Sequence, residues 1–363
     1  MIKIVNVVGA RPNFMKVAPI HRRMLADSSF SPMLLHTGQH YDAKMSQTFF
    51  HELAMPEPDL YLGVGSGSHA EQTAAVMLAT EQLFTENRPD WVLVVGDVNS
   101  TLAVSLVAAK MHLPIAHVES GLRSFDRTMP EEINRILTDS LCDLFFITEQ
   151  SGWDHLIHEG ADVHKMHLVG NVMIDSLVEH LAKAKGLTIA EELGVAGQAY
   201  GLMTLHRPSN VDNPTILKTI VDAIAVVQKE MPIIFPVHPR TTKMLSQFGL
   251  EPVIRSLSQL ILTEPLGYLA FLKLMSEAHF VITDSGGIQE ETTFLDVPCL
   301  TLRESTERPI TITMGTNRLV PLNTEAIIAH VGQACNGAIH RQAMPPFWDG
   351  QTSQRILQVF NQL

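Results

Sequence analysis

Short runs of apolar, often β-branched residues alternate with longer segments in which apolar residues recur at helical spacing, along nearly the whole chain. Such runs, buried on both faces and separated by helices, predict a parallel sheet with right-handed crossover connections. In the first half, strands are expected at Lys3–Val8, Met33–His36, Trp91–Val95, Ile115–Val118, Leu144–Ile147 and Met166–Val169, and helices at Ala70–Thr85, Ser100–Met111 and Pro130–Cys142.

The second half repeats this architecture without repeating the sequence. Its strands are expected at Tyr200–Thr204, Ile233–Pro236, Leu260–Leu262, His279–Thr283 and Pro298–Thr301, and its helices at Pro214–Lys229, Tyr268–Ser276, Gly287–Leu295 and Thr324–Asn336. The pattern predicts an α/β protein of two doubly wound domains. Ligands of such folds bind at the carboxyl ends of the strands, so we expect an interdomain cleft there.

The domain boundary is expected near Gly170, which gives a first domain of residues 1–170 and a second of residues 171–350. The Ala-, Gly- and Glu-rich stretch Lys183–Gln198 is interpreted as a helix end followed by a surface loop. Residues 351–363 have the pattern of a C-terminal helix that can cross back to the first domain.

Length and composition agree with two domains and exclude several classes of protein. At about 150 residues per domain, 363 residues suffice for two. The formal charge of −12 argues against binding to nucleic acid or to an anionic membrane, and 45% hydrophobic residues exclude general disorder. The three cysteines form no CxxC pair, and neither a signal peptide nor a run of about 18 apolar residues is present. We expect a reduced, cytoplasmic protein.

Cationic residues follow the first predicted strand. Gly9 permits a tight turn, Pro12 can open a helix, and Arg11 and Lys16 add positive charge near that helix N-terminus. The segment predicts an anion site; the alternative is an ordinary strand–helix turn with solvated cations. It is no dinucleotide fingerprint, because GxGxxG is absent.

Three acids follow successive strands of the first half. Asp97 and Glu119 come at strand ends, and Glu131 lies in the first turn of the next helix. Two of them have a purely structural alternative. Asp97 can be a helix N-cap, and Glu131 can complement the helix dipole or pair with Arg135 at the surface. Because carboxyl ends of parallel strands share one edge, we expect the three acids to lie together.

The second half supplies cations and a small-residue turn. His206-Arg207 and His238-Pro239-Arg240 follow neighbouring strands. The segment Asp284–Glu291 ends a strand and opens a helix with small residues whose free backbone N–H groups suit a phosphate, although a simple N-cap has the same pattern. We expect no metal ion.

Taken in order, these motifs resemble the non-hydrolysing UDP-N-acetylglucosamine 2-epimerase family over nearly the whole chain. The matching segments are Gly9-Ala10-Arg11-Pro12, Thr37-Gly38-Gln39-His40, Gly96-Asp97, His117-Val118-Glu119-Ser120-Gly121-Leu122-Arg123, Pro130-Glu131-Glu132-Ile133-Asn134-Arg135, Gly170-Asn171, His206-Arg207, Pro236-Val237-His238, Asp284-Ser285-Gly286-Gly287-Ile288-Gln289-Glu290-Glu291 and Thr306-Glu307-Arg308-Pro309. The resemblance implies two Rossmann-like domains in a glycosyltransferase-B-like arrangement, no cofactor, and a homodimer.

The resemblance also implies roles for individual residues. The residues it implies for binding the UDP-sugar are Arg11, Lys16, His238, Phe271 (against the uracil), Ser285, Gly286, Gly287, Glu291 (at the ribose) and Arg308. The implied catalytic residues are Asp97, Glu119, Glu131, Arg135 and His206, with His206 near the diphosphate. Which carboxylate is the base and which the acid stays open.

The implied activity is reversible C2 epimerisation of UDP-N-acetylglucosamine (UDP-GlcNAc) to UDP-N-acetylmannosamine (UDP-ManNAc). It proceeds by elimination of UDP to 2-acetamidoglucal and re-addition, and it supplies activated sugars for cell-surface polysaccharide. Asp42 stands where family members activated by their substrate carry Gln, which argues against such activation. Two alternatives are epimerisation of UDP-2,3-diacetamido-2,3-dideoxyglucuronate and a hydrolysing UDP-GlcNAc 2-epimerase. Two further alternatives, a glycosyltransferase and an inactive nucleotide-sugar sensor, agree less well with the set of acids and cations.

Overall fold

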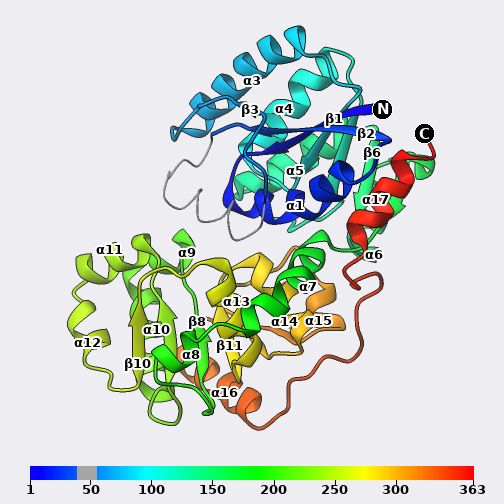
Figure 1. Ribbon diagram of the computed structural model, residues 1–363. Coiled ribbons are helices and arrows are strands. Elements are labelled where there is room, and N and C mark those ends of the chain that lie inside the picture. Colours follow the sequence, from blue (N-terminus) through cyan, green and yellow to red (C-terminus); the bar gives the residue numbers. More distant parts are fainter. Residues whose placement is uncertain (39–54) are drawn as a thin grey trace. The chain divides into compact units, whose positions relative to one another are not determined.

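The computed structural model describes residues 1–38 and 55–363, except for the side chains of Arg11 and Pro12. The chain forms two compact units, one of residues 1–179 and 346–363 and one of residues 180–345. Each unit is a parallel sheet covered by helices (Figure 1).

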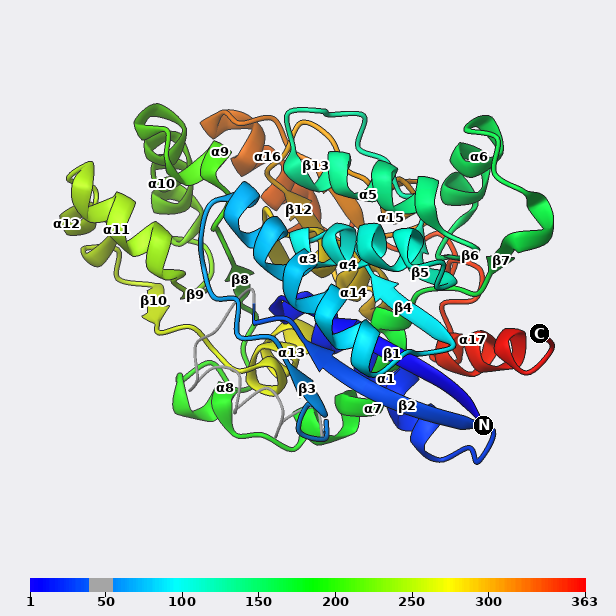
Figure 2. The ribbon, with the colours of Figure 1, turned by 90° about the horizontal axis from the view of Figure 1, so that it is seen from above.

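The first unit contains a seven-stranded sheet with the strand order β3-β2-β1-β4-β5-β6-β7. The strands are β1 (Ile2–Val8), β2 (Phe30–His36), β3 (Leu60–Tyr61), β4 (Trp91–Val95), β5 (Ile115–Ser120), β6 (Leu144–Ile147) and β7 (Met166–Leu168). The helices are α1 (Arg11–Leu25), α3 (His69–Glu86), α4 (Asn99–Lys110), α5 (Pro130–Leu141), α6 (Gln150–His158), α7 (Val172–Lys185, which continues into the second unit) and α17 (Thr352–Phe360). Helices α3, α4 and α5 lie side by side, and α1 packs with α17 on the other face (Figure 2).

The second unit contains a six-stranded sheet with the corresponding order β10-β9-β8-β11-β12-β13. The strands are β8 (Gly201–Met203), β9 (Ile233–Pro236), β10 (Leu260–Thr263), β11 (Phe280–Thr283), β12 (Cys299–Thr301) and β13 (Asn317–Leu319). The helices are α8 (Ile189–Glu192), α9 (Pro208–Val211), α10 (Pro214–Val227), α11 (Pro239–Gln247), α12 (Glu251–Arg255), α13 (Tyr268–Glu277), α14 (Gly286–Leu295), α15 (Ile310–Thr313) and α16 (Thr324–Cys335). Both sheets are doubly wound, and their order reverses beside β1 and beside β8.

Every strand expected from the sequence is present, with ends shifted by up to three residues. The short strands β3 and β13 were not expected; both lie at sheet edges. The stretch Lys183–Gln198 is not only a helix end and a loop, because it also contains the one-turn helix α8. Ala190 of this helix is buried, so the helix packs against the rest of its unit.

The boundary between the units differs from the one expected near Gly170. It falls between Glu179 and His180, inside the continuous helix α7. The first half of α7 belongs to the first unit because Ile174 is fully buried and the Asp175 carboxylate accepts the backbone N–H groups of Thr352 (3.0 Å) and Ser353 (2.7 Å).

Residues 346–363 group with the first unit. Phe360 of α17 is buried, and its ring meets those of Phe30, Trp91 and Phe146 edge-on at centroid distances of 6.4, 5.5 and 5.6 Å. Aromatic burial of this kind fixes the end of the chain to the first sheet. No helix among residues 1–38 and 55–363 has the length and apolar character that a membrane crossing requires.

Candidate active site

Glu119 and Lys16 form a buried ion pair at the carboxyl edge of the first sheet. Lys16, on α1, places Nζ 2.5 Å from Oε2 of Glu119, and both side chains are less than a tenth exposed. Glu119 has a φ of 71° and follows Val118 as an extra residue in the ladder between β5 and β6. The resulting bulge turns the carboxylate toward Gly96, the residue before Asp97; Oε2 is 3.6 Å from the ideal Cβ position of Gly96.

Asp97 is held by the buried guanidinium of Arg135, which pairs with it and with Glu132. The Glu132 carboxylate also accepts the backbone N–H groups of Ser124 and Phe125, each at 2.9 Å. Burial by itself would raise the pKa of Glu132, but these N–H groups and Arg135 lower it below its ordinary value. Arg135 is therefore fixed between two carboxylates.

Two simple interpretations of these acids are wrong. Arg135 does not form a surface pair with Glu131, because it is buried and reaches back to Glu132, while Glu131 is exposed. Asp97 is not the N-cap of α4, because that position is occupied by Val98. Asp97 instead keeps a third of its side chain exposed beside Arg135.

A buried network behind these carboxylates was not expected from the sequence. His117 on β5 lies between Asp139 of α5 (Nδ1 to Oδ1, 2.6 Å) and the carbonyl oxygen of Gly96 (Nε2 to O, 2.8 Å). Arg123 completes it, 2.8 Å from Oδ2 of Asp139. The motif containing His117 and Glu119 indicated the acid. It did not indicate Asp139, because residues that meet only in the fold have no characteristic spacing in the sequence.

In the second unit, Asp284 organises the turn that carries His206. The fully buried Asp284 carboxylate lies 3.0 Å from Nδ1 of His206 and accepts the backbone N–H groups of His206 (3.0 Å) and Arg207 (2.9 Å). Burial would raise the pKa of Asp284, but His206 and these N–H groups lower it. His206 remains 42% exposed at its side chain, and its ring centroid is 5.8 Å from that of His238.

Arg308 lies beside the start of α14, the helix that follows β11. Its Nε is 2.7 Å from Glu290 Oε1, and Nη1 is 2.5 Å from Glu307 Oε1. Both contacts leave Gly286 packed tightly, since an ideal Cβ there would lie 2.9 Å from Arg308 Nη1, whereas one on Gly287 would meet nothing within 4 Å. The helix start is therefore open at Gly287, whereas beside Gly286 the Arg308 guanidinium is paired with the carboxylates of Glu290 and Glu307.

The other expected binding residues of this unit lie on neighbouring elements. Glu291, on α14, is buried and accepts a hydrogen bond from the hydroxyl of Tyr268 at 2.9 Å. Phe271 is partly buried on α13, the helix that Tyr268 begins. His238 is the N-cap of α11 and accepts the backbone N–H of Arg240 at 3.2 Å. Tyr268 is a neighbour that the sequence motifs did not point to.

Some expectations fall outside the described residues. The side chain of Arg11 is one; only its place at the start of α1 is described. The segment Gln39-His40-Tyr41-Asp42 is another. Within residues 1–38 and 55–363, no group of three or more His, Cys, Asp or Glu residues is arranged to hold a metal ion.

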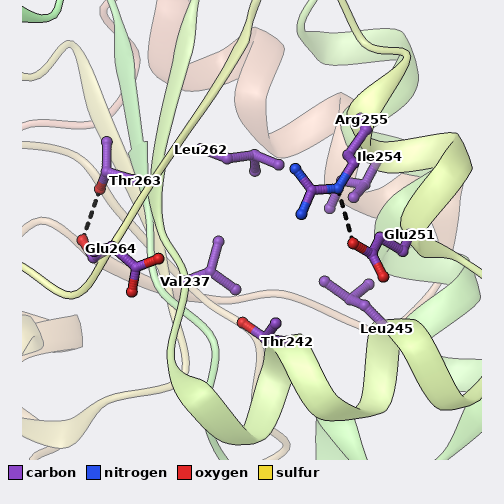
Figure 3. Close-up of a pocket in the computed structure, with 9 residues that line it drawn as sticks. All are labelled: Val237, Thr242, Leu245, Glu251, Ile254, Arg255, Leu262, Thr263 and Glu264. Carbon is purple, nitrogen blue, oxygen red and sulfur yellow. Dashed lines mark hydrogen bonds and ion pairs between the residues drawn. The ribbon is translucent and has the colours of Figure 1, made fainter.

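A pocket of about 290 Å³ lies on the second unit near the ends of β9 and β10 (Figure 3). Leu245 and Ile254 form part of its apolar lining, and the ion pair of Glu251 with Arg255 (2.8 Å) forms one wall. His206, Ser285 and Arg308 do not line it. The polar clusters described above are therefore separate from this pocket.

Both clusters lie where the strand order of a sheet reverses. Asp97 follows β4 next to β1, and His206 and Asp284 follow β8 and β11, which are neighbours. This is where doubly wound folds bind ligands. The fold is of the glycosyltransferase-B-like class: a lipopolysaccharide outer core galactosyltransferase aligns with all of this chain at a TM-score of 0.56 and 14% identity, which shows the fold alone.

Comparison with known proteins identifies the family. The family described as UDP-N-acetylglucosamine 2-epimerase matches residues 22–361. A UDP-N-acetylglucosamine 2-epimerase of Methanocaldococcus jannaschii is 40% identical over 363 residues, covering 99% of this chain and 98% of the relative. The crystal structure of that organism's enzyme in complex with UDP-GlcNAc and UDP covers 100% of both chains with a TM-score of 0.91 and 39% identity. The chain belongs to the UDP-N-acetylglucosamine 2-epimerase family and is an isomerase.

A relative with a different substrate in its name is nearly as similar. The UDP-2,3-diacetamido-2,3-dideoxy-D-glucuronate 2-epimerase of Pseudomonas aeruginosa is 37% identical over 366 residues and covers 100% of both chains. Family membership therefore identifies the type of reaction, 2-epimerisation of a nucleotide sugar, but does not identify which sugar is the substrate.

Proposed function

We propose that the protein reversibly converts UDP-GlcNAc to UDP-ManNAc, by elimination of UDP and its re-addition to the opposite face of a 2-acetamidoglucal. The observation that carries the proposal is the carboxylate pair at the reversal point of the first sheet. Glu119, paired with Lys16, lies against Gly96, and Asp97 follows it, paired with Arg135.

Elimination suits this substrate because the hydrogen on C2 has no carbonyl group beside it in the ring and is not acidic. In the forward step, a carboxylate takes the C2 proton, the C1–O bond breaks, and UDP leaves with the bonding electron pair. Addition reverses these steps with the proton delivered to the other face. The ion pair with Lys16 holds the Glu119 carboxylate at this sheet edge. Asp97 and Glu131 complete the set of proposed carboxylates.

The leaving diphosphate requires positive charge and N–H donors. We assign this role to His206, Arg308 and the start of α14 in the second unit, together with Arg11. The residues that then hold the rest of the UDP-sugar are Lys16, His238, Phe271, Ser285, Gly286, Gly287 and Glu291. Support comes from the orientation of His206 by Asp284 and from the open face of Gly287.

The direct experiment is incubation of the protein with UDP-GlcNAc, followed by NMR, without added nicotinamide cofactor and with EDTA present. Appearance of UDP-ManNAc is the expected result. Free N-acetylmannosamine with UDP instead would identify a hydrolysing enzyme. Activity that disappears with EDTA and returns with a divalent cation would contradict the proposed metal-independent mechanism.

Epimerisation of UDP-2,3-diacetamido-2,3-dideoxyglucuronate is the second candidate, favoured by the full-length similarity to the Pseudomonas aeruginosa enzyme. Parallel reactions with the two nucleotide sugars distinguish the candidates by their kcat/KM ratio. For either sugar we propose a cytoplasmic role in supplying an activated sugar for cell-surface polysaccharide.

We also propose that the protein is a homodimer. Helix α5 buries its polar residues and exposes Ile133 (40%) and Leu137 (44%), and Leu78 of α3 is 71% exposed. Helices α3, α4 and α5 lie side by side, so these apolar side chains belong to one helical layer that suits a second copy (Figure 2). Sedimentation of the protein and of Leu137→Glu tests this: the substitution is expected to produce a monomer.

A further inference from the structure

The conformation of Glu119 requires support from its surroundings. A residue other than glycine at a φ of 71° is strained, and Glu119 is also the extra residue where the register of the ladder shifts between Val118 and Ser120. Such a conformation persists only where neighbouring contacts hold the chain on both sides. The ion pair with Lys16 holds the side chain but not the backbone.

Asp139 of α5 contacts the chain on both sides of the bulge, through the His117 side chain and the Gly121 backbone N–H. Its Oδ1 lies 2.6 Å from Nδ1 of His117, two residues before Glu119, and its Oδ2 accepts the N–H of Gly121, two residues after it, at 3.0 Å. Gly121 is itself constrained, with a φ of 80° and an ideal Cβ position only 2.2 Å from the carbonyl oxygen of Gly152. One carboxylate thus spans the bulge.

His117 extends this contact to the neighbouring strand end. Its Nε2 is 2.8 Å from the carbonyl oxygen of Gly96, which immediately precedes Asp97. The His117 ring thus links the Asp139 carboxylate to the Gly96 carbonyl oxygen through its two nitrogens. Burial would raise the pKa of Asp139, but His117, Arg123 and the Gly121 N–H lower it, which agrees with an ionised carboxylate.

We propose that Asp139 is a positioning residue for the epimerase reaction, which fixes the Glu119 and Asp97 carboxylates relative to one another through the Glu119 bulge and His117. The proposal rests on the proposed function, in which these carboxylates move the C2 proton. Asp139 is buried and acts through the Glu119 bulge and His117 rather than by contact with the substrate. Its effect is on the geometry of proton transfer, which tolerates little displacement of the reacting groups.

The test compares Asp139→Asn with a matched control, Asp175→Asn. Asp175 is also a buried carboxylate of the first unit that accepts backbone N–H groups, but it holds the start of α17. Asparagine keeps the size, but its amide nitrogen cannot accept, so the variant loses either the His117 contact at Oδ1 or the Gly121 and Arg123 contacts at Oδ2. We expect kcat of Asp139→Asn to fall about 10- to 100-fold with KM within about 3-fold. Asp175→Asn is expected to lower the melting temperature similarly and to keep kcat within about 2-fold.

Incorporation of solvent deuterium at C2 gives a second readout, because it follows proton transfer itself. It is expected to slow in Asp139→Asn in parallel with kcat. If Asp139→Asn is insoluble, His117→Asn breaks the same network from its other end and is expected to give the same split between kcat and KM. Equal kcat values for the Asp139 and Asp175 variants, or an unchanged kcat in a folded His117→Asn protein, would overturn the proposal.

The wild-type protein separates this inference from the proposed function. A wild-type protein that turns over neither UDP-GlcNAc nor the diacetamidoglucuronate contradicts the proposed function. A wild-type protein that is active while Asp139→Asn matches its control contradicts only the positioning role.

Discussion

The Asp284 carboxylate and the His206 ring lie 3.0 Å apart, Oδ1 to Nδ1, and Asp284 also accepts the backbone N–H group of His206. The carboxylate is fully buried, whereas the ring is 42% exposed at its side chain. This arrangement fixes the orientation of the imidazole and leaves Nε2 on the accessible side. A ring that is held on one side and partly exposed on the other suits contact with a diphosphate.

Replacement of Asp284 by Asn is therefore expected to weaken UDP binding by about 10- to 100-fold. The variant loses the anion that orients His206 and places an amide among backbone N–H donors, at a cost of about 1–3 kcal/mol. Calorimetric titration with UDP measures the effect. Asp212→Asn is the control, because Asp212 also pairs with a side chain, that of Arg240, but is partly exposed. Equal UDP affinity in the two variants would show that Asp284 does not support the nucleotide site.

Glu119→Gln and Asp97→Asn are each expected to lower kcat by roughly 10²–10⁴-fold, because an amide of the same size cannot transfer the C2 proton. UDP affinity is expected to survive, since most of the proposed UDP contacts lie in the second unit. Kinetics with the nucleotide sugar and titration with UDP separate the two effects. Glu71→Gln, in the exposed capping box of α3, serves as the control. Loss of UDP affinity with turnover retained would assign Glu119 or Asp97 a structural role instead.

Gly286 and Gly287 are adjacent in α14 but differ in the space around them. An alanine Cβ at Gly286 would lie 2.8 Å from Glu307 Oε1 and 2.9 Å from Arg308 Nη1, whereas at Gly287 it would meet nothing within 4 Å. We expect Gly286→Ala to displace Arg308 and lower the free energy of unfolding by about 1–3 kcal/mol. Gly287→Ala is expected to leave it unchanged or raise it by about 0.5–1 kcal/mol, because alanine favours the helix.

UDP binding distinguishes further between the two glycine variants. If the open face of Gly287 receives the diphosphate, both substitutions weaken UDP binding although only Gly286→Ala is destabilised. Thermal unfolding with and without UDP measures both quantities on one sample. A Gly287→Ala protein with wild-type UDP affinity would remove Gly287 from the proposed site.

The sequence predicted the positions of the candidate residues at strand ends, whereas their roles stay predictions. Asp97, Glu119, His206 and Ser285 follow apolar runs whose length and spacing identify them as parallel strands, so their place at the sheet edge follows from topology. The edge strands β3 and β13 have two and three residues, too few for a pattern to indicate them. These two strands are identified only by their pairing with β2 and β12 in the folded sheets.

The choice between neighbouring residues could not be made from the sequence. Glu131 and Glu132 both lie in the first turn of α5, and only the packing of that helix shows that Glu132 faces Arg135. Helix α5 buries its polar side, so its hydrophobic pattern predicts the wrong face as the one that packs against the first unit. Asp139, 22 residues from His117, contacts it only through the fold.

His36 predicts how the stability of the first unit depends on pH. Its ring lies between Phe14 and Tyr61, with centroids 5.1 Å from each, and Nδ1 accepts the backbone N–H of Gly38 at 2.8 Å. That hydrogen bond requires an unprotonated Nδ1. Burial lowers the pKa of His36 from 6.5 to about 4.

The direction of the effect follows from the two pKa values. Between about pH 6.5 and pH 4 the unfolded chain binds a proton at His36 and the folded protein does not, so acidification favours unfolding. The stabilisation is fully present above pH 6.5 and falls by up to about 1.4 kcal/mol per pH unit, roughly 3 kcal/mol in all. His36→Asn removes the titrating group while its side-chain oxygen can still accept from Gly38. Urea unfolding at pH 7.5 and 4.5 should therefore show a smaller loss in His36→Asn than in the wild-type protein, with the exposed His158→Asn as the control. Parallel losses in all three proteins would mean that the folded state also protonates His36 over this range, and that the Gly38 hydrogen bond does not hold the ring neutral.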